Sequence, residues 1–114
     1  MNIKELQTLV VKFRDERDWK QFHNPKDCAL SLVLESAEVL EHFQWKNGEE
    51  ITKHLEKEKE SLSHELADVL YWVLLMSNDL GIDIAEAFQK KLKISGEKYP
   101  VEKSKGKSDK YTKL

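Results

Sequence analysis

Residues 64–78 read HELADVLYWVLLMSN, and they place two acids, Glu65 and Asp68, inside one of the most apolar stretches of the chain. A spacing of three residues brings both side chains to one face of a helix, because an α-helix turns by about 100° per residue. An unpaired carboxylate is costly to bury among apolar groups. The stretch therefore predicts a central helix whose acids are protonated, paired with bases or bound to a cation.

The leucine-rich pattern extends this central helix over residues 62–80, where Gly81 is well placed to end it. On the N-terminal side, residues 25–44 are apolar around most of a helical circumference, which is typical of a helix buried on several sides. Asn24 and Pro25 form a good helix start, as a cap and a first-turn proline. The second helix carries its own acid pair, Glu35 and Glu38, again three residues apart.

Two further helices complete an all-α prediction. An apolar stripe predicts a first helix over residues 3–15, and Asp83 with Glu86 resembles a capping box that opens a fourth helix ending near Lys98. The charged run 49–60 is expected to be an exposed helical or irregular connection, and no strand pattern competes. We therefore predict one four-helix bundle domain over residues 1–100 and a basic C-terminal tail over residues 101–114.

Composition excludes several functional classes. The 114 residues suit a single domain, and a net charge of −2 does not favour a nucleic-acid partner. The single Cys28 excludes an internal disulfide, and no apolar run approaches the ~18 residues of a membrane span. The N-terminus does not resemble a signal peptide, so a cytoplasmic location is expected. Nine lysines lie from Lys90 onward against three acids, which favours either a solvated tail or an arm that meets an anionic ligand.

If the two central helices pack antiparallel, their four carboxylates can converge on one spot. Converging anions need counter-charge, and ligands that are all oxygen favour a hard cation, with Mg²⁺ the first choice. Either acid pair alone is more often a solvated helix face, whereas two such pairs in apolar surroundings are harder to explain that way. A di-iron centre is disfavoured because no histidine follows a glutamate by three residues.

Three tryptophans, Trp19, Trp45 and Trp72, lie near helix ends or near the acids. Each alone is more simply a packing anchor, but together with a metal site they favour a nucleotide, whose base stacks well on indole. Lysines of the fourth helix and the tail, notably Lys91 and Lys98, can then meet its phosphates.

The residues 16–45 (ERDWKQFHNPKDCALSLVLESAEVLEHFQW), 64–75 (HELADVLYWVLL), 80–92 (LGIDIAEAFQKKL), 98–106 (KYPVEKSKG) and 110–114 (KYTKL) resemble the all-α nucleoside triphosphate pyrophosphohydrolases of the MazG type, nearest to their dCTP-pyrophosphatase-like branch. The resemblance covers almost the whole chain. It implies a four-helix bundle assembled as a homotetramer, or at least a dimer, and Mg²⁺-dependent hydrolysis of a nucleoside triphosphate to the monophosphate and pyrophosphate.

The resemblance also implies roles for individual residues. It assigns metal binding to Glu35, Glu38, Glu65 and Asp68, and the role of general base to one of these acids or to Glu41. It places Trp19 and Trp45 around the base, and Lys91 and Tyr99 near the phosphates. Two further substrate-binding positions, Trp72 and Ser95, differ from the tyrosine and asparagine usual in the dCTP-directed relatives, and base choice depends on such groups.

The leading hypothesis is therefore a pyrophosphohydrolase acting on a (deoxy)nucleoside triphosphate, such as dCTP or a modified relative, in cleansing of the nucleotide pool. The departures at Trp72 and Ser95 motivate an alternative, in which the protein is a non-catalytic nucleotide sensor or a helical partner protein. The preferred base, the number of metal ions and the choice between dimer and tetramer stay open at this stage.

Overall fold

The computed structural model describes residues 1–114 and contains helices without any strand, as predicted. The long helices are α1 (Ile3–Glu16), α2 (Pro25–Glu41), α3 (Glu49–Asp79) and α4 (Ile84–Lys98), with a short α5 (Val101–Ser104) and two 3₁₀ turns, η1 (Lys20–Phe22) and η2 (Tyr111–Lys113). The chain forms two compact units, Met1–Gly81 and Ile82–Leu114, which are described separately. The predicted division into a 1–100 domain and a 101–114 tail stays a prediction.

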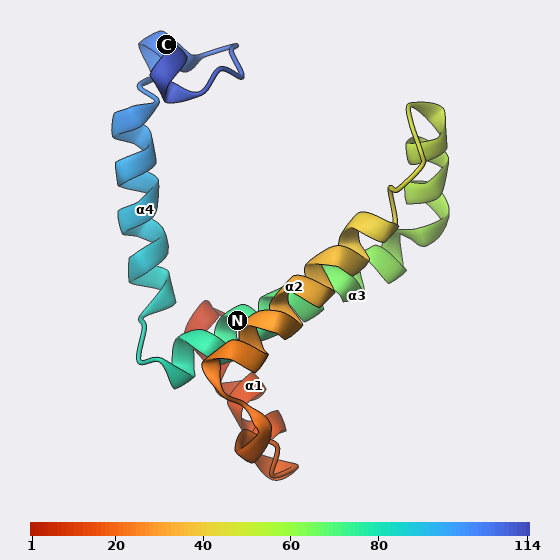
Figure 1. The fold of residues 1–114 in the computed structure, drawn as a ribbon, viewed down its shortest axis with the longest axis vertical. Helices are drawn as coiled ribbons and strands as arrows, with labels where there is room; N and C mark the ends of the chain where they lie inside the picture. The colour runs from red at the N-terminus through yellow and green to blue at the C-terminus, as the bar shows by residue number, and fades with distance from the viewer. The chain divides into compact units, whose positions relative to one another are not determined.

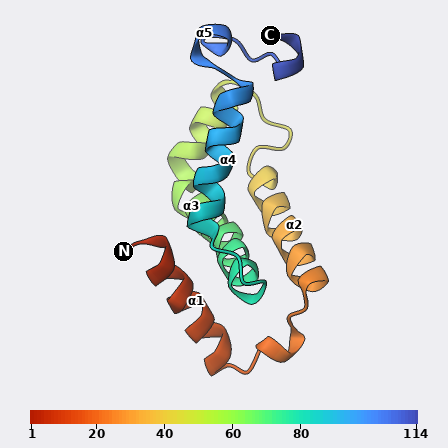
Figure 2. The same ribbon diagram turned by 90° about the vertical axis from the view of Figure 1, so that its left-hand side faces the viewer.

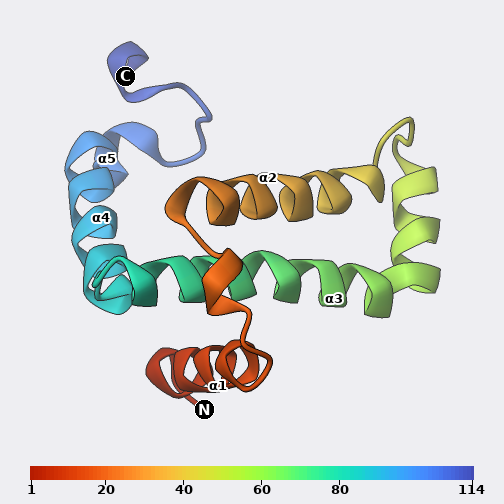
Figure 3. The ribbon, with the colours of Figure 1, turned by 60° about the horizontal axis from the view of Figure 1, so that its bottom comes forward.

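In the first unit (Figure 1), α3 is the central element, and it lies between α1 and α2 (Figures 2 and 3). Figure 3 shows α2 alongside α3 and running in the opposite direction, which is the antiparallel arrangement that convergence of the acid pairs requires. The fully buried apolar side chains are few, namely Cys28 of α2 and Leu74 and Leu75 of α3. The second half of α3 therefore supplies most of the core of this unit.

A polar seam joins α1 to the C-terminal end of α3. Arg14 is only 1% exposed, and its guanidinium donates to Asp79 Oδ2 at 2.6 Å and to Asp15 Oδ1 at 3.0 Å. Burial opposes the charged form of Arg14, but the bonds to the two carboxylates outweigh it and raise the arginine's pKa. Gln7 Nε2 also donates to Leu74 O and to Ser77 Oγ, each at 3.0 Å. These bonds fix α1 in one position along α3.

Helix α3 is longer than predicted. It begins at Glu49, directly after Gly48, whose φ of +46° suits a residue without a side chain. The run expected as a connection is thus helical, because its glutamates, lysines and leucine are good helix formers. Glu58 has non-helical angles (φ −115°, ψ 19°), and the helix bends there, as Figure 3 shows. The bend directs the first turns of α3 away from the axis of the rest.

Helix α2 begins as predicted, with Asn24 Oδ1 accepting from Asp27 N at 2.8 Å and Pro25 in the first turn. It ends at Glu41, slightly before the expected Gln44. The predicted burial on several sides is wrong within the first unit: Val33, Leu34 and Leu40 are each about two-thirds exposed. The reason is that α3 is the only long helix with extensive contacts to α2.

In the second unit α4 has the predicted start, with Asp83 Oδ1 accepting from Glu86 N at 3.1 Å. The segment 101–114, which the sequence predicts as a basic tail, contains α5 and η2. Tyr99 and Tyr111 pack edge to face with ring centroids 5.9 Å apart, and Lys98 Nζ lies 4.9 Å from the Tyr111 ring centroid. Aromatic packing therefore folds the end of the chain back onto the end of α4. None of the helices in either unit combines the length and apolarity that a membrane crossing needs.

Candidate functional site

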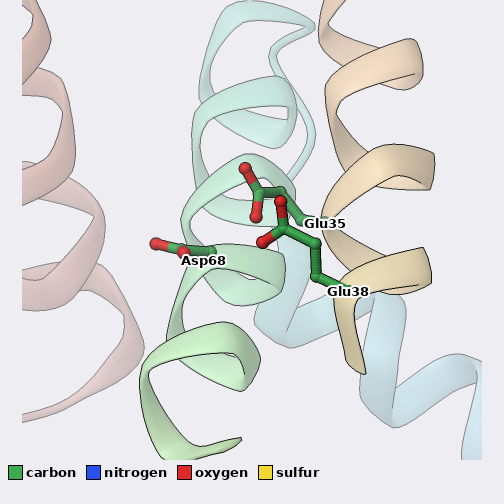
Figure 4. A group of neighbouring side chains, drawn as sticks. All are labelled: Glu35, Glu38 and Asp68. Atoms are coloured by element: carbon green, nitrogen blue, oxygen red, sulfur yellow. The ribbon is translucent and has the colours of Figure 1, made fainter. Parts of the chain in front are cut away.

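Three of the predicted acids meet between α2 and α3. Glu35, Glu38 and Asp68 each offer a carboxylate oxygen, and these three oxygens lie within 4.8 Å of one another. Figure 4 shows Glu35 and Glu38 reaching from α2 toward Asp68 on α3. The helical spacing brings the two glutamates to one face, and the antiparallel packing of the helices supplies the aspartate. We call these residues the acidic trio.

Glu35 has the most perturbed environment of the trio. It is partly buried, while Glu38 and Asp68 are exposed, and its Oε2 is buried without a hydrogen-bond partner. Desolvation raises the pKa of Glu35, and the nearby charges of Glu38, Asp68 and Glu65 raise it further. The ionised form of Glu35 is therefore disfavoured, and a cation bound beside it would favour that form.

The trio fits a hard divalent cation. All three donors are carboxylate oxygens, which Mg²⁺ prefers over nitrogen or sulfur ligands. Ligands around Mg²⁺ lie at about 2.0–2.1 Å from the ion, so neighbouring oxygens must approach to roughly 3 Å of one another. Oxygens already within 4.8 Å need only small side-chain rotations to reach that separation. The unpartnered oxygen of Glu35 is the one that gains most from such a bond.

An apolar cavity of about 630 Å³ opens beside the trio, with Glu35 and Asp68 in its wall. Trp19 and Trp72 line it together with Phe13 and Tyr71, and the base-binding role of the two tryptophans stays a prediction. The rings brace one another edge to face: Phe13 lies 5.9 Å from Trp19 and 6.3 Å from Tyr71 between centroids. The cavity is large enough for a nucleoside and combines aromatic surface with two acids at one end.

Glu65, the fourth predicted metal ligand, is not part of the trio. Its Oε2 is in direct contact with Nε2 of His42, although the ring N–H is not aligned with it as in a regular hydrogen bond. The other ring nitrogen of His42, Nδ1, lies 2.7 Å from Nε2 of His54. Glu65 thus has a histidine partner in this structure. Its assignment as a metal ligand stays a prediction.

The remaining predicted site residues lie elsewhere. Trp45 follows α2 with a φ of +68° and is 89% exposed, and Glu41 is exposed in the last turn of α2. Lys91, Ser95 and Tyr99 belong to α4 and its C-terminal cap, in the second unit. The structure therefore places Trp19 and Trp72 in one cavity wall with Glu35 and Asp68, and the roles of all the predicted site residues stay predictions.

Sequence reasoning missed the pairing of His42 with His54 and the contribution of Phe13 and Tyr71 to the cavity wall. One signal was available, because His54 and Glu65 are 11 residues apart and 11 residues make three helical turns. However, this spacing predicts a shared face only in a straight helix, and α3 bends at Glu58. His42 lies seven residues after Glu35, which places both on one face of α2.

Comparison with known proteins identifies the family of this chain. A model of the MazG-like family matches residues 30–114, which include the acidic trio and both histidines. The chain belongs to the MazG-like family. This membership confirms the predicted resemblance.

Relatives of this MazG-like chain include dCTP pyrophosphatase 1 from Mus musculus, which is 36% identical to it, and dCTP pyrophosphatase 1 from Homo sapiens, which is 34% identical. Each match covers 98% of this chain and 67% of the relative. A pyrophosphatase from Archaeoglobus fulgidus DSM 4304, known from its crystal structure, is similar with a TM-score of 0.80 and 38% identity over 85% of this chain and 91% of its own. The predicted all-α fold of the MazG-like pyrophosphatase type is thus confirmed.

Proposed function

We propose that this MazG-like chain is a nucleoside triphosphate pyrophosphohydrolase that uses Mg²⁺ to convert a deoxynucleoside triphosphate, such as dCTP or a modified relative, to the monophosphate and pyrophosphate. The relatives named dCTP pyrophosphatase and the similar pyrophosphatase structure support the reaction class. The observation that carries the proposal is the acidic trio beside an aromatic cavity, with Glu35 and Asp68 in the cavity wall. One part can hold a metal-bound triphosphate, and the other can hold the base.

In this proposal Glu35, Glu38 and Asp68 hold the metal, with Glu65 as a further ligand. A bound Mg²⁺ supplies counter-charge to the phosphates and polarises a phosphoryl oxygen. The carboxylates repel one another, and a bound cation would relieve this repulsion.

In this proposal an acidic residue also accepts the proton that the attacking water releases. The water oxygen forms a bond to the α-phosphorus, the bond from that phosphorus to the bridging oxygen of the β-phosphate breaks, and pyrophosphate leaves. Glu38 is exposed within the trio and can accept the proton that the water releases. Glu41 lies one turn further along α2 and is the second proposed base.

Base selection is proposed to depend on Trp19 and Trp72. Their indoles offer faces for stacking, which is worth about 1–3 kcal/mol per base and discriminates little between bases. The cavity wall is mostly apolar, with Tyr71 and the two acids as its main polar groups. Stacking and shape are therefore expected to dominate recognition, which suits bases with extra apolar substituents as well as cytosine.

The assembly is proposed to be a homo-oligomer, either a dimer or a tetramer. The exposed leucines and valine of α2 support this proposal, since a contiguous apolar helix face is rarely left in water. Lys91, Ser95 and Tyr99 are proposed to meet the phosphates, as basic and polar groups of the second unit.

The test is to incubate the purified protein with a panel of deoxy- and ribonucleoside triphosphates and Mg²⁺ in water enriched in ¹⁸O. Attack at the α-phosphorus puts the label in the nucleoside monophosphate, and attack at the β-phosphorus puts it in pyrophosphate. We expect label in the monophosphate, and loss of turnover in Glu38→Gln. The control is Glu60→Gln, which neutralises an exposed glutamate of α3 that forms no ion pair.

Three other outcomes would count against the proposal. Label in pyrophosphate would assign the attack to the wrong phosphorus. Release of inorganic phosphate with a diphosphate product would indicate a different phosphohydrolase. Mg²⁺-dependent nucleotide binding without turnover would favour the nucleotide-sensor alternative, which calorimetry with the same panel detects directly.

A further inference from the structure

The proposed chemistry does not account for the contact of Glu65 with His42, or for that of His42 with His54. His42 caps the C-terminal end of α2, His54 lies in the first part of α3, and Glu65 lies beyond the bend at Glu58. Three separate pieces of backbone thus place their side chains in one row. The side chain of His42, in the middle, is only 9% exposed, so little water competes for its ring nitrogens.

The order of donors along this row follows from elementary chemistry. An ionised carboxylate can only accept, so the favourable state has a proton on His42 Nε2, which contacts Glu65 Oε2. His42 Nδ1 and His54 Nε2 are 2.7 Å apart, a distance that requires one of them to donate and the other to accept. Neutral His42 therefore accepts from His54 and carries its own proton on Nε2, the ring atom in contact with Glu65.

Packing holds the two imidazoles in this orientation. Their ring centroids are 5.0 Å apart at an angle of 67°, and Phe43 packs against both rings, at 6.3 Å from His42 and 6.2 Å from His54. Rings held on their edges and faces cannot rotate freely. Glu65, by contrast, has three side-chain torsions and no other hydrogen bond or ion pair.

We infer that His42, braced by His54, is a positioning residue that fixes the carboxylate of Glu65 beside the acidic trio. This inference rests on the proposed function, because it gives Glu65 its use as a metal ligand there. Glu65 is close enough to the trio for its charge to act on Glu35. Partners that orient a ligating carboxylate typically change metal affinity or activity by about 10- to 100-fold when they are removed.

The experiment measures Mg²⁺ affinity by calorimetry. Because Mg²⁺ prefers oxygen ligands to histidine nitrogen, its affinity depends on the carboxylates and not on direct binding to the histidines. We expect His42→Leu to weaken Mg²⁺ binding by about 10-fold or more. His42→Gln keeps an N–H donor and is expected to recover most of that affinity. His54→Phe keeps an aromatic ring but loses the hydrogen bond to His42. It is therefore expected to weaken Mg²⁺ binding in the otherwise wild-type protein, and to have no further effect when combined with His42→Leu.

Two further readouts separate positioning from simple damage. His64→Gln changes an exposed histidine next to Glu65 in sequence and is expected to leave Mg²⁺ affinity unchanged. In protein free of metal, the ¹⁵N resonances of the His42 ring are expected to shift in Glu65→Gln and in His54→Phe, and less in Glu60→Gln. At saturating Mg²⁺, kcat of His42→Leu is expected to return toward the wild-type value.

Each result decides one of the two claims. The positioning role would be overturned if His42→Leu left the Mg²⁺ affinity unchanged, or if Glu65→Gln did not shift the His42 resonances. Either result would leave the pyrophosphohydrolase proposal in place. Weakened Mg²⁺ binding in His42→Leu, with a wild type that hydrolyses no nucleotide, would support the positioning role and overturn the proposed function. A wild type that binds no Mg²⁺ would overturn both.

Discussion

Replacing Glu35 by glutamine removes one negative charge from the acidic trio and keeps the side-chain shape, so its two effects on stability should have opposite signs. In protein without metal, the change removes the repulsion between Glu35 and each of Glu38 and Asp68. At a separation of 4.8 Å two unit charges repel by about 0.9 kcal/mol in water and by about 3.5 kcal/mol at an effective dielectric constant of about 20.

The lower value is the appropriate one, because Glu38 and Asp68 are exposed. Two such pairs give a gain of about 1–2 kcal/mol, which corresponds to roughly 3–10 °C in Tm for a chain of this size. With Mg²⁺ present, the variant has lost a ligand and the stabilisation that binding supplies. Glu35→Gln is therefore expected to melt above the wild type in chelator and to show little of the wild type's Tm increase with Mg²⁺.

Differential scanning fluorimetry across a Mg²⁺ titration measures both effects in one plate, and circular dichroism confirms that the helix content is unchanged. Glu60→Gln serves as the matched control, since it neutralises an exposed glutamate of α3 that forms no ion pair, and its melting curves should follow the wild type at every Mg²⁺ concentration. A Glu35→Gln protein that melts lower in chelator would refute the repulsion argument. An undiminished response to Mg²⁺ would remove Glu35 from the metal site.

Three other predictions follow from burial and charge. Asp79→Asn should cost about 2–3 kcal/mol in urea unfolding, because it leaves the buried Arg14 with only Asp15, whereas Asp15→Asn should cost far less, its side chain being 51% exposed. Because folding raises the pKa of Glu35, acidification from neutral pH through that raised pKa toward about 4.5 should stabilise the metal-free protein and weaken Mg²⁺ binding. Melting curves and calorimetry at several pH values measure these two effects. A Mg²⁺ affinity that does not change across this pH window would contradict the assignment of Glu35 as a metal ligand. Leu34→Glu on the exposed face of α2 should reduce the mass measured by light scattering to that of a smaller species, and an unchanged mass would place the interface elsewhere.

Much of the site could be predicted from spacing alone. Acids three residues apart on a helix share a face whatever the rest of the chain does, so each acid pair was visible in the sequence. The cap at Asn24 and the capping residue Asp83 were equally local, because a side-chain oxygen there bonds to a backbone N–H three residues away. The aromatic wall was visible in part, through Trp19 and Trp72.

Other features depended on how the helices pack. The extension of α3 to Glu49 and its bend at Glu58 place His54 where it meets His42, and no periodicity in the sequence marks such a bend. The burial of Arg14 against Asp79 joins residues 65 positions apart. The exposure of the apolar face of α2 reflects the absence of a covering element within the first unit.

The sequence by itself determined the helices, the starts of α1, α2 and α4, and the faces on which the carboxylates lie, since these follow from backbone geometry within a few residues. Only the tertiary structure decided which acids lie close enough to one another to share an ion. Glu35, Glu38 and Asp68 meet because α2 and α3 pack antiparallel in one register, and the same register brings Glu65 to His42. A choice between partners a few ångströms apart depends on helix packing and bending, which side-chain spacing along one helix does not encode.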